Sequence, residues 1–392
     1  MLQKQSPTPI FTPHENPYEP LSWIELRKTA LIHNAAMYKK TTDGKNIAFV
    51  IKGNAYGHGI REIALLCEDI DDIDWLCTFT LSEALMLRSL GSSKPILVLG
   101  PLDAPIAHAL GASIDVIVDN HEQAEQLNIC ARQENKKVGV HVKVDTGLSR
   151  RGVLPDQAMK LLMHVSSLSH LTLNGLCTHL VESYKEDASF THHQLKQFNA
   201  LIYQAREYGM AIPFIHATNT AGTTIFSHDE YNFFRIGIGL YGILPSQPTR
   251  EKTRLRYPDF ELEPVLQWKT VLTQIKDIPA HAYVSYDRTY QTYRPTRIGL
   301  LPIGYSDGYD IRLSNKGLVY IRGAYAPVLG RVGMNTTIID LTTISQAQEK
   351  DEVTLIGSPF EIRADIVSSY AQCINVRELF TGIKGYIPRI VI

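Results

Sequence analysis

The stretch Ala48-Phe-Val-Ile-Lys52-Gly-Asn-Ala-Tyr56-Gly-His58-Gly59 decides how this chain folds. Its apolar start predicts a buried parallel strand, and its glycines open a turn before the apolar-periodic stretch 60–67. Lys52 is therefore expected at the carboxyl end of a strand. An amine there can hold an aldehyde as a Schiff base if its pKa is depressed, although a single strand-end lysine is more often just solvated. Tyr56 adds a hydroxyl donor, and the glycine-spaced turn lets backbone amides approach a phosphate.

Strand and helix signals alternate on both sides of this stretch. Thr80 with Glu83 predicts a capping box, Asn120 a helix cap and Pro155 a first helical turn, while residues 23–40 show a helical period. The predicted strands are Ala48–Lys52, Trp75–Phe79, Ile96–Gly100, Asp115–Asp119, Gly139–Asp145, Leu173–Thr178, Phe214–Asn219 and Phe233–Ile238. This alternation favours a (β/α)8 TIM-type barrel over a doubly wound sheet, because no glycine-rich dinucleotide fingerprint follows the first strand.

The pattern changes after about Thr253. Short alternating stretches, beginning with 265–275, are separated by Gly, Pro, Asn and Asp, and only Ile362–Cys373 shows a helical period. We therefore predict a mobile, proline-rich leader over residues 1–21, a barrel over 22–254 and a β-rich domain over 255–392.

Composition narrows the function classes. A formal net charge of -1 over 392 residues, with no massed Lys or Arg, argues against nucleic acid or a membrane surface as the main partner. The cysteines at 67, 77, 130, 177 and 373 are scattered without metal-type or redox-type pairing, so we expect no metal site. The leader has no apolar signal-peptide region, so we expect these cysteines to be reduced thiols of a cytoplasmic protein.

The run from Ala48 to Gly59 resembles the pyridoxal-phosphate motif of alanine racemases, with Gly53 in place of the commoner alanine. The resemblance implies a two-domain enzyme in which Lys52 holds pyridoxal 5'-phosphate covalently and Tyr56 binds the cofactor phosphate. It extends over nearly everything from Trp23 to Arg389 in the same order.

Later strand ends continue the resemblance. It implies that Arg150 hydrogen-bonds the phenolic oxygen of the cofactor and contacts the substrate, and that Lys143 is modified as a carbamate, whose negative charge would orient Arg150. A plain surface cation remains the alternative for Lys143. His179 matches the histidine beside the pyridine-binding arginine, and Asn219 and Thr220 bring amide and hydroxyl groups near the phosphate.

The eighth predicted strand ends with Arg235-Ile-Gly237-Ile238. The resemblance assigns Arg235 to the pyridine nitrogen and the backbone amides of Gly237 and Ile238 to the phosphate. An arginine does not give up a proton, so the ring stays largely neutral and is a weaker electron sink than a carboxylate partner would make it. This favours racemisation over transamination and decarboxylation.

Racemisation needs acid/base groups on both faces of Cα, and Lys52 serves one of them. The resemblance assigns the other to Tyr286, contributed across a homodimer interface, although an aromatic in a half-buried strand would explain Tyr286 as well. It also implies that Tyr305 lies at the entrance and that the amide of Met334 binds the substrate carboxylate.

The chain departs from the family pattern where a substrate would lie. Gly333 and Asn335 stand where the family commonly has cysteine and aspartate, and Arg377 stands at the place of its phosphate-binding tyrosine. Arg377 is expected to bind the phosphate, to face the substrate pocket, or to point to solvent.

The first interpretation is a cytoplasmic, homodimeric racemase with shared active sites that interconverts L- and D-alanine for cell-wall peptides. Serine or broad-specificity racemisation remains an alternative. A fold-related decarboxylase should carry an acidic partner for the pyridine nitrogen, against which Arg235 argues. A non-catalytic pyridoxal-phosphate carrier of the single-barrel type would leave the last third of the chain unexplained.

Overall fold

The computed structural model describes residues 19–227 and 229–392, which divide into two compact units. The barrel unit consists of Arg27–Val265 with Asn375–Thr381. The β unit consists of the stretch ending at Leu26, Leu266–Ile374 and Gly382–Ile392. The predicted leader lies outside the described residues except for residues 19–21.

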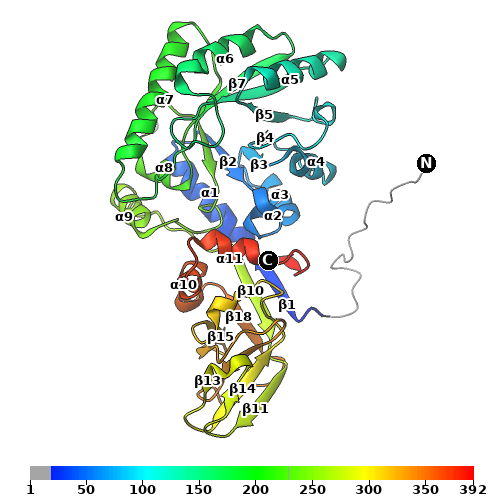
Figure 1. Ribbon diagram of the computed structural model, residues 1–392, viewed down its shortest axis with the longest axis vertical. Coiled ribbons are helices and arrows are strands. Elements are labelled where there is room, and N and C mark those ends of the chain that lie inside the picture. Colours follow the sequence, from blue (N-terminus) through cyan, green and yellow to red (C-terminus); the bar gives the residue numbers. More distant parts are fainter. Residues whose placement is uncertain (1–18, 228) are drawn as a thin grey trace, which may run out of the picture. The chain divides into compact units, whose positions relative to one another are not determined.

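The strands of the barrel unit form one parallel sheet in the order β8-β7-β6-β5-β4-β3-β2-β9, rolled into a near-barrel (Figure 1). Asn232 links its two edges, because its N–H donates to the carbonyl of Ile215 (3.2 Å) and its Oδ1 accepts from the N–H of Ile215 (2.9 Å). The strands are β2 (Asn46–Val50), β3 (Trp75–Thr78), β4 (Ile96–Val98), β5 (Ile114–Val118), β6 (Val138–Lys143), β7 (Leu171–Cys177), β8 (Phe214–His216) and β9 (Phe233–Ile236). Each predicted strand overlaps one of them, so the predicted TIM-type barrel is confirmed.

Helices alternate with these strands and follow the predicted caps. Thr80 and Glu83 form the capping box of α4, Asn120 accepts from the N–H of Gln123 at the start of α5, and Pro155 begins α6. The helices are α1 (Lys28–Thr41), α2 (Lys52–Tyr56), α3 (Ile60–Glu68), α4 (Leu81–Ser89), η1 (Ile106–His108), α5 (His121–Gln133), α6 (Pro155–Ser167), α7 (Ser189–Glu207), α8 (Thr220–Ile225), α9 (Gln247–Arg256) and α11 (Val376–Gly382). Within residues 19–227 and 229–392, no helix combines the length and the apolar character needed to cross a membrane.

Apolar side chains fill the interior of the barrel. Ala48, Val50, Cys77, Leu97, Ile117, Cys177 and Phe233 form one buried cluster. Since such a barrel is a packed core and not a pore, its chemistry is confined to the carboxyl ends of the strands and the loops that follow them.

The β unit contains a six-stranded sheet in the order β16-β15-β18-β10-β1-β19, a three-stranded sheet β11-β14-β17 and the hairpin β12-β13. Its elements are β1 (Ser22–Leu26), β10 (Leu266–Val271), β11 (Gln274–Ile278), β12 (Tyr283–Val284), η2 (Tyr286–Arg288), β13 (Tyr290–Gln291), β14 (Thr296–Leu301), η3 (Ile311–Leu313), β15 (Leu318–Ile321), β16 (Ala324–Pro327), β17 (Thr337–Asp340), β18 (Glu352–Ile356), η4 (Phe360–Ile362), α10 (Ala364–Tyr370) and β19 (Arg389–Val391). The predicted mostly β region is confirmed.

Three local predictions are wrong. The helical period predicted from Trp23 begins only at Lys28, because residues 22–26 alternate between buried and half-buried side chains and form β1, which pairs antiparallel with β10. The stretch 265–275 is two strands, β10 and β11, interrupted after Val271. A second helix, α11, follows α10, although the sequence predicted only Ile362–Cys373.

Candidate active site

The chain turns in an unusual way directly after β2. That strand ends at Val50, two residues before the position predicted from the sequence, and Lys52 begins a turn with left-handed φ angles at Gly53 (62°), Asn54 (53°), Ala55 (51°) and Tyr56 (53°). Each non-glycine residue in this conformation costs roughly 1–2 kcal/mol, so the turn persists only because surrounding contacts hold it. It brings Lys52 and Tyr56 into one cavity.

This cavity, of about 720 Å³, lies at the carboxyl ends of the barrel strands. All the site residues predicted for the barrel line it, and so does Arg377, which the sequence placed in the β-rich domain but which α11 brings to the barrel unit. The predicted site residues in the cavity are Lys52, Tyr56, Lys143, Arg150, His179, Asn219, Thr220, Arg235, Gly237, Ile238 and Arg377. Five of these carry cationic side chains, whereas Glu83 is the one acid among the residues that line the cavity. The cavity therefore suits an anionic ligand.

The pKa values of the two cavity lysines are both lowered. Burial, followed by the positive charges of Arg150 and Arg377, lowers the pKa of Lys52. Burial also lowers the pKa of Lys143, as do Arg235 and Arg150. A lowered pKa makes more of each amine available as a neutral nucleophile at pH 7.

One end of the cavity offers hydroxyl groups and backbone amides. Thr220 Oγ1 accepts from the N–H groups of Gly237 and Gly239 at 3.2 Å each, and Asn219 caps α8. A Cβ atom on Gly237 would lie 2.6 Å from the hydroxyl oxygen of Tyr56, so only glycine allows the phenol to lie there. These donors fit a phosphate group.

Asp145 holds the loop that carries Arg150. Its Oδ1 accepts from the N–H groups of Gly147 (2.9 Å), Leu148 (2.7 Å) and Ser149 (3.1 Å), and its Oδ2 accepts from the N–H of Arg150 (3.0 Å). Against the effect of burial, these bonds lower the pKa of Asp145. Asp145 is the last residue of the predicted strand Gly139–Asp145, but its supporting role was not predicted.

Arg235 is fixed by a chain of buried hydrogen bonds below the cavity. Its guanidinium donates to Nδ1 of His216 and to the carbonyl of Thr178 (2.7 Å), and it lies 3.5 Å from Nδ1 of His179. His216 Nε2 and His141 Nδ1 are 2.8 Å apart, and His141 Nε2 is 3.2 Å from Asp115 Oδ2. We call Arg235, His216, His141 and Asp115 the floor relay.

The hydrogen bonds of the floor relay determine the tautomers of His216 and His141. An arginine only donates, so Nδ1 of His216 must accept and its Nε2–H must donate to Nδ1 of His141. The Nε2–H of His141 is then left to donate to Asp115. Burial, reinforced by Arg235, lowers the pKa of His216 well below its ordinary value, which keeps this imidazole neutral.

The lowered pKa values of two buried histidines predict that the protein becomes less stable in mild acid. Burial and then Arg235 also lower the pKa of His179 well below its ordinary value. Both His179 and His216 take up a proton on unfolding once the pH drops below about 6.5, so the free energy of unfolding should fall by about 1.4 kcal/mol per pH unit for each histidine. Urea unfolding at pH 5.5 and pH 4.5, both below the unfolded pKa of about 6.5, measures this slope.

The matched controls for this prediction are single histidine variants. His179→Asn should lose about half of the slope, whereas His193→Asn, on the exposed face of α7, should retain it. A stability that does not change between the two pH values would contradict the neutral state of the buried imidazoles.

The site residues predicted for the β unit lie on segments that touch one another. The N–H of Tyr305 donates to the carbonyl of Gly333 (3.0 Å), and Ser306 Oγ donates to the carbonyl of Met334 (2.8 Å). A Cβ atom on Gly333 would lie 3.8 Å from the ring of Tyr286. The side chains of Tyr286, Tyr305 and Met334 are 70%, 42% and 56% exposed in the described chain, so this surface of the β unit is open.

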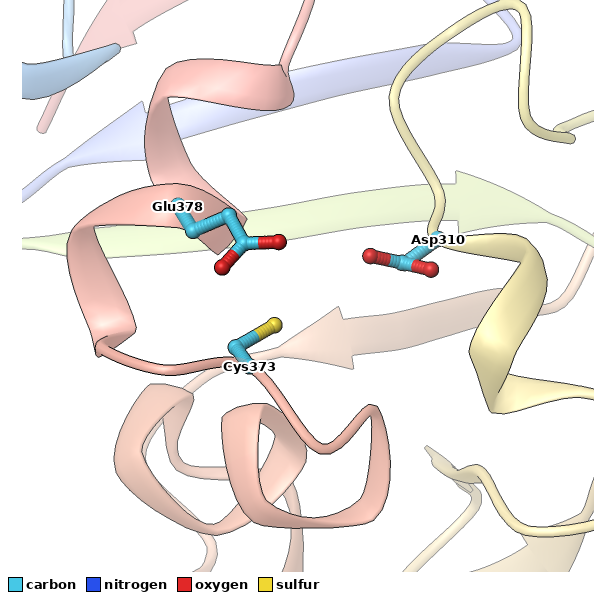
Figure 2. A group of neighbouring side chains, drawn as sticks. All are labelled: Asp310, Cys373 and Glu378. Carbon is cyan, nitrogen blue, oxygen red and sulfur yellow. The ribbon is translucent and has the colours of Figure 1, made fainter.

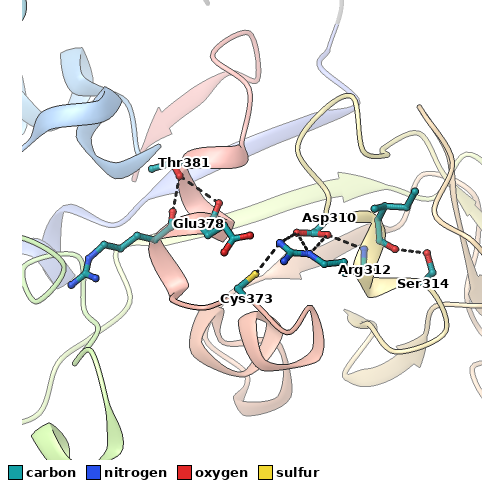
Figure 3. A network of polar contacts seen from close by, with 8 residues as sticks. Asp310, Arg312, Ser314, Cys373, Glu378 and Thr381 are labelled. Atoms are coloured by element: carbon teal, nitrogen blue, oxygen red, sulfur yellow. Dashed lines mark hydrogen bonds and ion pairs between the residues drawn. The ribbon is translucent and has the colours of Figure 1, made fainter. Parts of the chain in front are cut away.

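In the β unit, the carboxylate of Asp310 and the thiol of Cys373 approach each other within 4.8 Å (Figure 2). Arg312 pairs with Asp310 (2.6 Å from Nη2 to Oδ2), and its Nη2 lies 3.5 Å from Sγ of Cys373 (Figure 3). Since a guanidinium already neutralises this carboxylate, the pair does not offer the anionic oxygen that a cation requires.

Family comparisons match both parts of the chain. The alanine racemase N-terminal domain matches residues 26–245, and the alanine racemase C-terminal domain matches residues 265–391. The chain belongs to the alanine racemase family.

Individual alanine racemases agree with this assignment. That of Halothermothrix orenii is 35% identical over 94% of this chain and 96% of its own length, and that of Leptospira interrogans serovar Lai is 32% identical over 95% and 96%. The solved alanine racemase of Clostridium difficile 630 has a TM-score of 0.88 at 28% identity, covering 96% of each chain. A histidine racemase from Leuconostoc mesenteroides reaches a TM-score of 0.84 at 25% identity, covering 97% of this chain and 99% of its own.

Alanine racemases depend on pyridoxal phosphate, and the cavity has the groups to hold it. Lys52 offers an amine of lowered pKa, the end around Tyr56 and Gly237 offers phosphate donors, and Arg150 and Arg235 offer charged donors for the ring substituents. This donor set fits a flat, anionic cofactor.

Proposed function

We propose that the protein interconverts the L- and D-enantiomers of alanine with pyridoxal phosphate held in the barrel cavity. The observation that carries this proposal is the convergence of all the site residues predicted for the barrel on one cationic cavity, in a chain of the alanine racemase family. When bound, pyridoxal phosphate supplies an aldehyde carbon and an electron-withdrawing ring.

The cavity residues divide the work of binding and proton transfer. Lys52 holds the cofactor and moves a proton on one face of Cα, for which its lowered pKa is suited. Tyr56, Asn219, Thr220 and the amides of Gly237 and Ile238 bind the phosphate. Arg150 orients the phenolic side of the cofactor and contacts the substrate. The amide of Met334, on the β unit, binds the substrate carboxylate.

Arg235 faces the ring nitrogen as a donor that keeps its proton. Its direct partners are His216 and backbone carbonyl oxygens, not a carboxylate. A fold-related decarboxylase would need an acid in this place, so the contacts of Arg235 favour racemisation. His179, beside Arg235, supports the guanidinium from the cavity side.

The β unit completes the proposal. Tyr286 is the base on the opposite face of Cα, Tyr305 lines the entrance, and two chains share their sites in a homodimer. A carbamate on Lys143 accords with its lowered pKa, because a neutral amine is the form that reacts with carbon dioxide. The buried thiols of Cys67, Cys77 and Cys177 suit a cytoplasmic enzyme, and D-alanine for cell-wall peptides would be its product.

Incubation of the purified protein with a panel of L-amino acids, followed by separation of the enantiomers, tests the proposal. Alanine should be racemised fastest. A preference for serine or for many amino acids would favour the alternative of broad specificity, to which Gly333 and its missing side chain beside Tyr286 would contribute. Release of carbon dioxide without racemisation would contradict the proposal.

Arg377 gives a separate prediction. Its charge acts on Tyr56 and Lys52, and both Arg377 and Thr381 of α11 line the cavity. Within that helix, Thr381 Oγ1 donates to the carbonyl of Arg377 at 2.8 Å, and Figure 3 shows Thr381. We therefore expect Arg377 to bind the phosphate, and Arg377→Ala should weaken cofactor retention by about 10-fold to 100-fold, the value of a hydrogen bond to a charged group. Fluorescence titration of the cofactor-free protein measures this affinity.

Arg132→Ala, on α5 and away from the cavity, serves as the control and should bind the cofactor like the parent chain. A changed amino-acid preference at unchanged cofactor affinity would instead place Arg377 in the substrate pocket. Unchanged affinity and preference would leave a solvent-facing guanidinium.

A further inference from the structure

Glu83 makes contacts that its place in a capping box does not explain. The capping box of α4 needs only the N–H groups near Thr80, to which Oε2 of Glu83 lies at 2.7 Å (Phe79) and 3.3 Å (Thr80). The second oxygen, Oε1, accepts from the N–H of Gly53 at 3.1 Å. One carboxylate thus joins the end of β3 to the residue directly after Lys52.

This link lies where the backbone is strained. Gly53 is the first of the left-handed residues that follow Lys52, and its N–H donates to Glu83. The same carboxylate fixes the N–H of Phe79, whose ring centre lies 5.5 Å from Nζ of Lys52. Glu83 therefore restrains both the backbone that carries the amine and the ring beside it.

The charge of Glu83 acts on the same amine. Arg150 and Arg377 lower the pKa of Lys52, whereas Glu83 and Cys77 act in the opposite direction. Lys52 in turn contributes to lowering the pKa of His179. Glu83 is the one carboxylate among the residues lining the cavity, and it opposes the two arginines. Without it, the ammonium form of Lys52 would face uncompensated positive charge.

We propose that Glu83 is a positioning residue that aims the Lys52 amine by bridging Gly53 and Phe79 and that balances the positive charge around it. The inference rests on the proposed function of Lys52 as the group that holds the cofactor. Neither the charge alone nor the cap alone gives this role, because it requires two oxygens that reach two different elements.

The test uses the amine itself as the readout. In the cofactor-free full chain, the rate at which Lys52 is acetylated by acetic anhydride, followed by mass spectrometry over a range of pH, reports its titration midpoint. Glu83→Gln keeps one oxygen for the helix cap but loses the charge and one acceptor. We expect its midpoint to fall by about 0.5–1 pH unit.

A second measurement follows the aim of the amine. Borohydride trapping of pyridoxal phosphate on Lys52, compared at a pH above the midpoint of each variant so that the amine is neutral in both, should be several-fold slower in Glu83→Gln because the amine is no longer aimed. Glu83→Asp, which keeps the charge but is one methylene too short to bridge both elements, should leave the midpoint near that of the parent chain and still slow trapping. Circular dichroism checks that each variant is folded.

Two controls separate this role from helix stability. Thr80→Ala removes the hydroxyl that accepts from the N–H of Glu83 (3.2 Å), and Glu122→Gln removes a first-turn acid from α5. Both should keep the parent midpoint and trapping rate. An unchanged midpoint and trapping rate in Glu83→Gln, or the same changes in Thr80→Ala, would overturn the inference while leaving the proposed function intact. Absence of trapping on Lys52 in the parent chain would overturn both.

Discussion

A Lys52→Ala variant will lose the visible absorption band of lysine-bound pyridoxal phosphate and will racemise alanine on the order of 10⁴-fold more slowly, or not at all. The change removes both the covalent anchor and the base on one face of Cα. No other amine stands in the turn after β2, so the loss cannot be compensated locally. Absorption spectra and the separation of alanine enantiomers measure the two effects.

Lys143→Ala is the matched control for this prediction, because Lys143 is the other lysine of the cavity and its pKa is lowered in the same direction. This variant should keep the absorption band. If the band disappears in Lys143→Ala and persists in Lys52→Ala, Lys143 holds the cofactor and the proposed role of Lys52 is wrong.

A Tyr286→Phe variant should bind the cofactor normally yet exchange the α-proton of L-alanine with solvent deuterium about 10²-fold to 10³-fold more slowly, while exchange from D-alanine is affected far less. The reason is that Lys52 and Tyr286 serve opposite faces of Cα, so only one direction loses its base. Exchange followed by proton NMR in deuterium oxide, starting from each enantiomer, separates the two.

Equal losses from both enantiomers would speak against two separate bases. The same variant also examines the proposed homodimer. Mixed Lys52→Ala and Tyr286→Phe chains should regain part of the activity if each site draws Lys52 from one chain and Tyr286 from the other. No recovery after demonstrated subunit exchange would refute shared sites.

The barrel and most of its cavity could be predicted because their signals are local. An apolar run followed by a glycine-spaced turn marks Lys52 within a dozen residues, and Thr80, Asn120 and Pro155 mark the helix starts that alternate with the strands. In a parallel barrel, residues that follow different strands converge on one end, and the resemblance to alanine racemases assigned the individual roles of these residues.

Contacts between distant elements could not be predicted. His141 and His216 lie 75 residues apart, and Asp115 lies 26 residues from His141, within apolar strands where each resembles an isolated polar residue. Only the capping role of Glu83 could be predicted, because its bond to Gly53 joins residues that lie 30 positions apart in the chain. The left-handed turn also runs against intrinsic preference at Ala55 and Tyr56, because glycine and, less often, asparagine are the residues that adopt this conformation, so tertiary contacts decide it.

The floor relay has a consequence for where protons can go. Each member donates to the next in a single direction, from Arg235 through His216 and His141 to Asp115. Passing a proton along it would require both imidazoles to exchange tautomers. The Nδ1 atom of His216 would then carry a proton that points at an N–H of Arg235, and a guanidinium cannot accept a hydrogen bond. The relay can therefore polarise the Arg235 guanidinium but cannot transfer a proton. Protons can then reach the reacting carbon only from groups at the open end of the barrel.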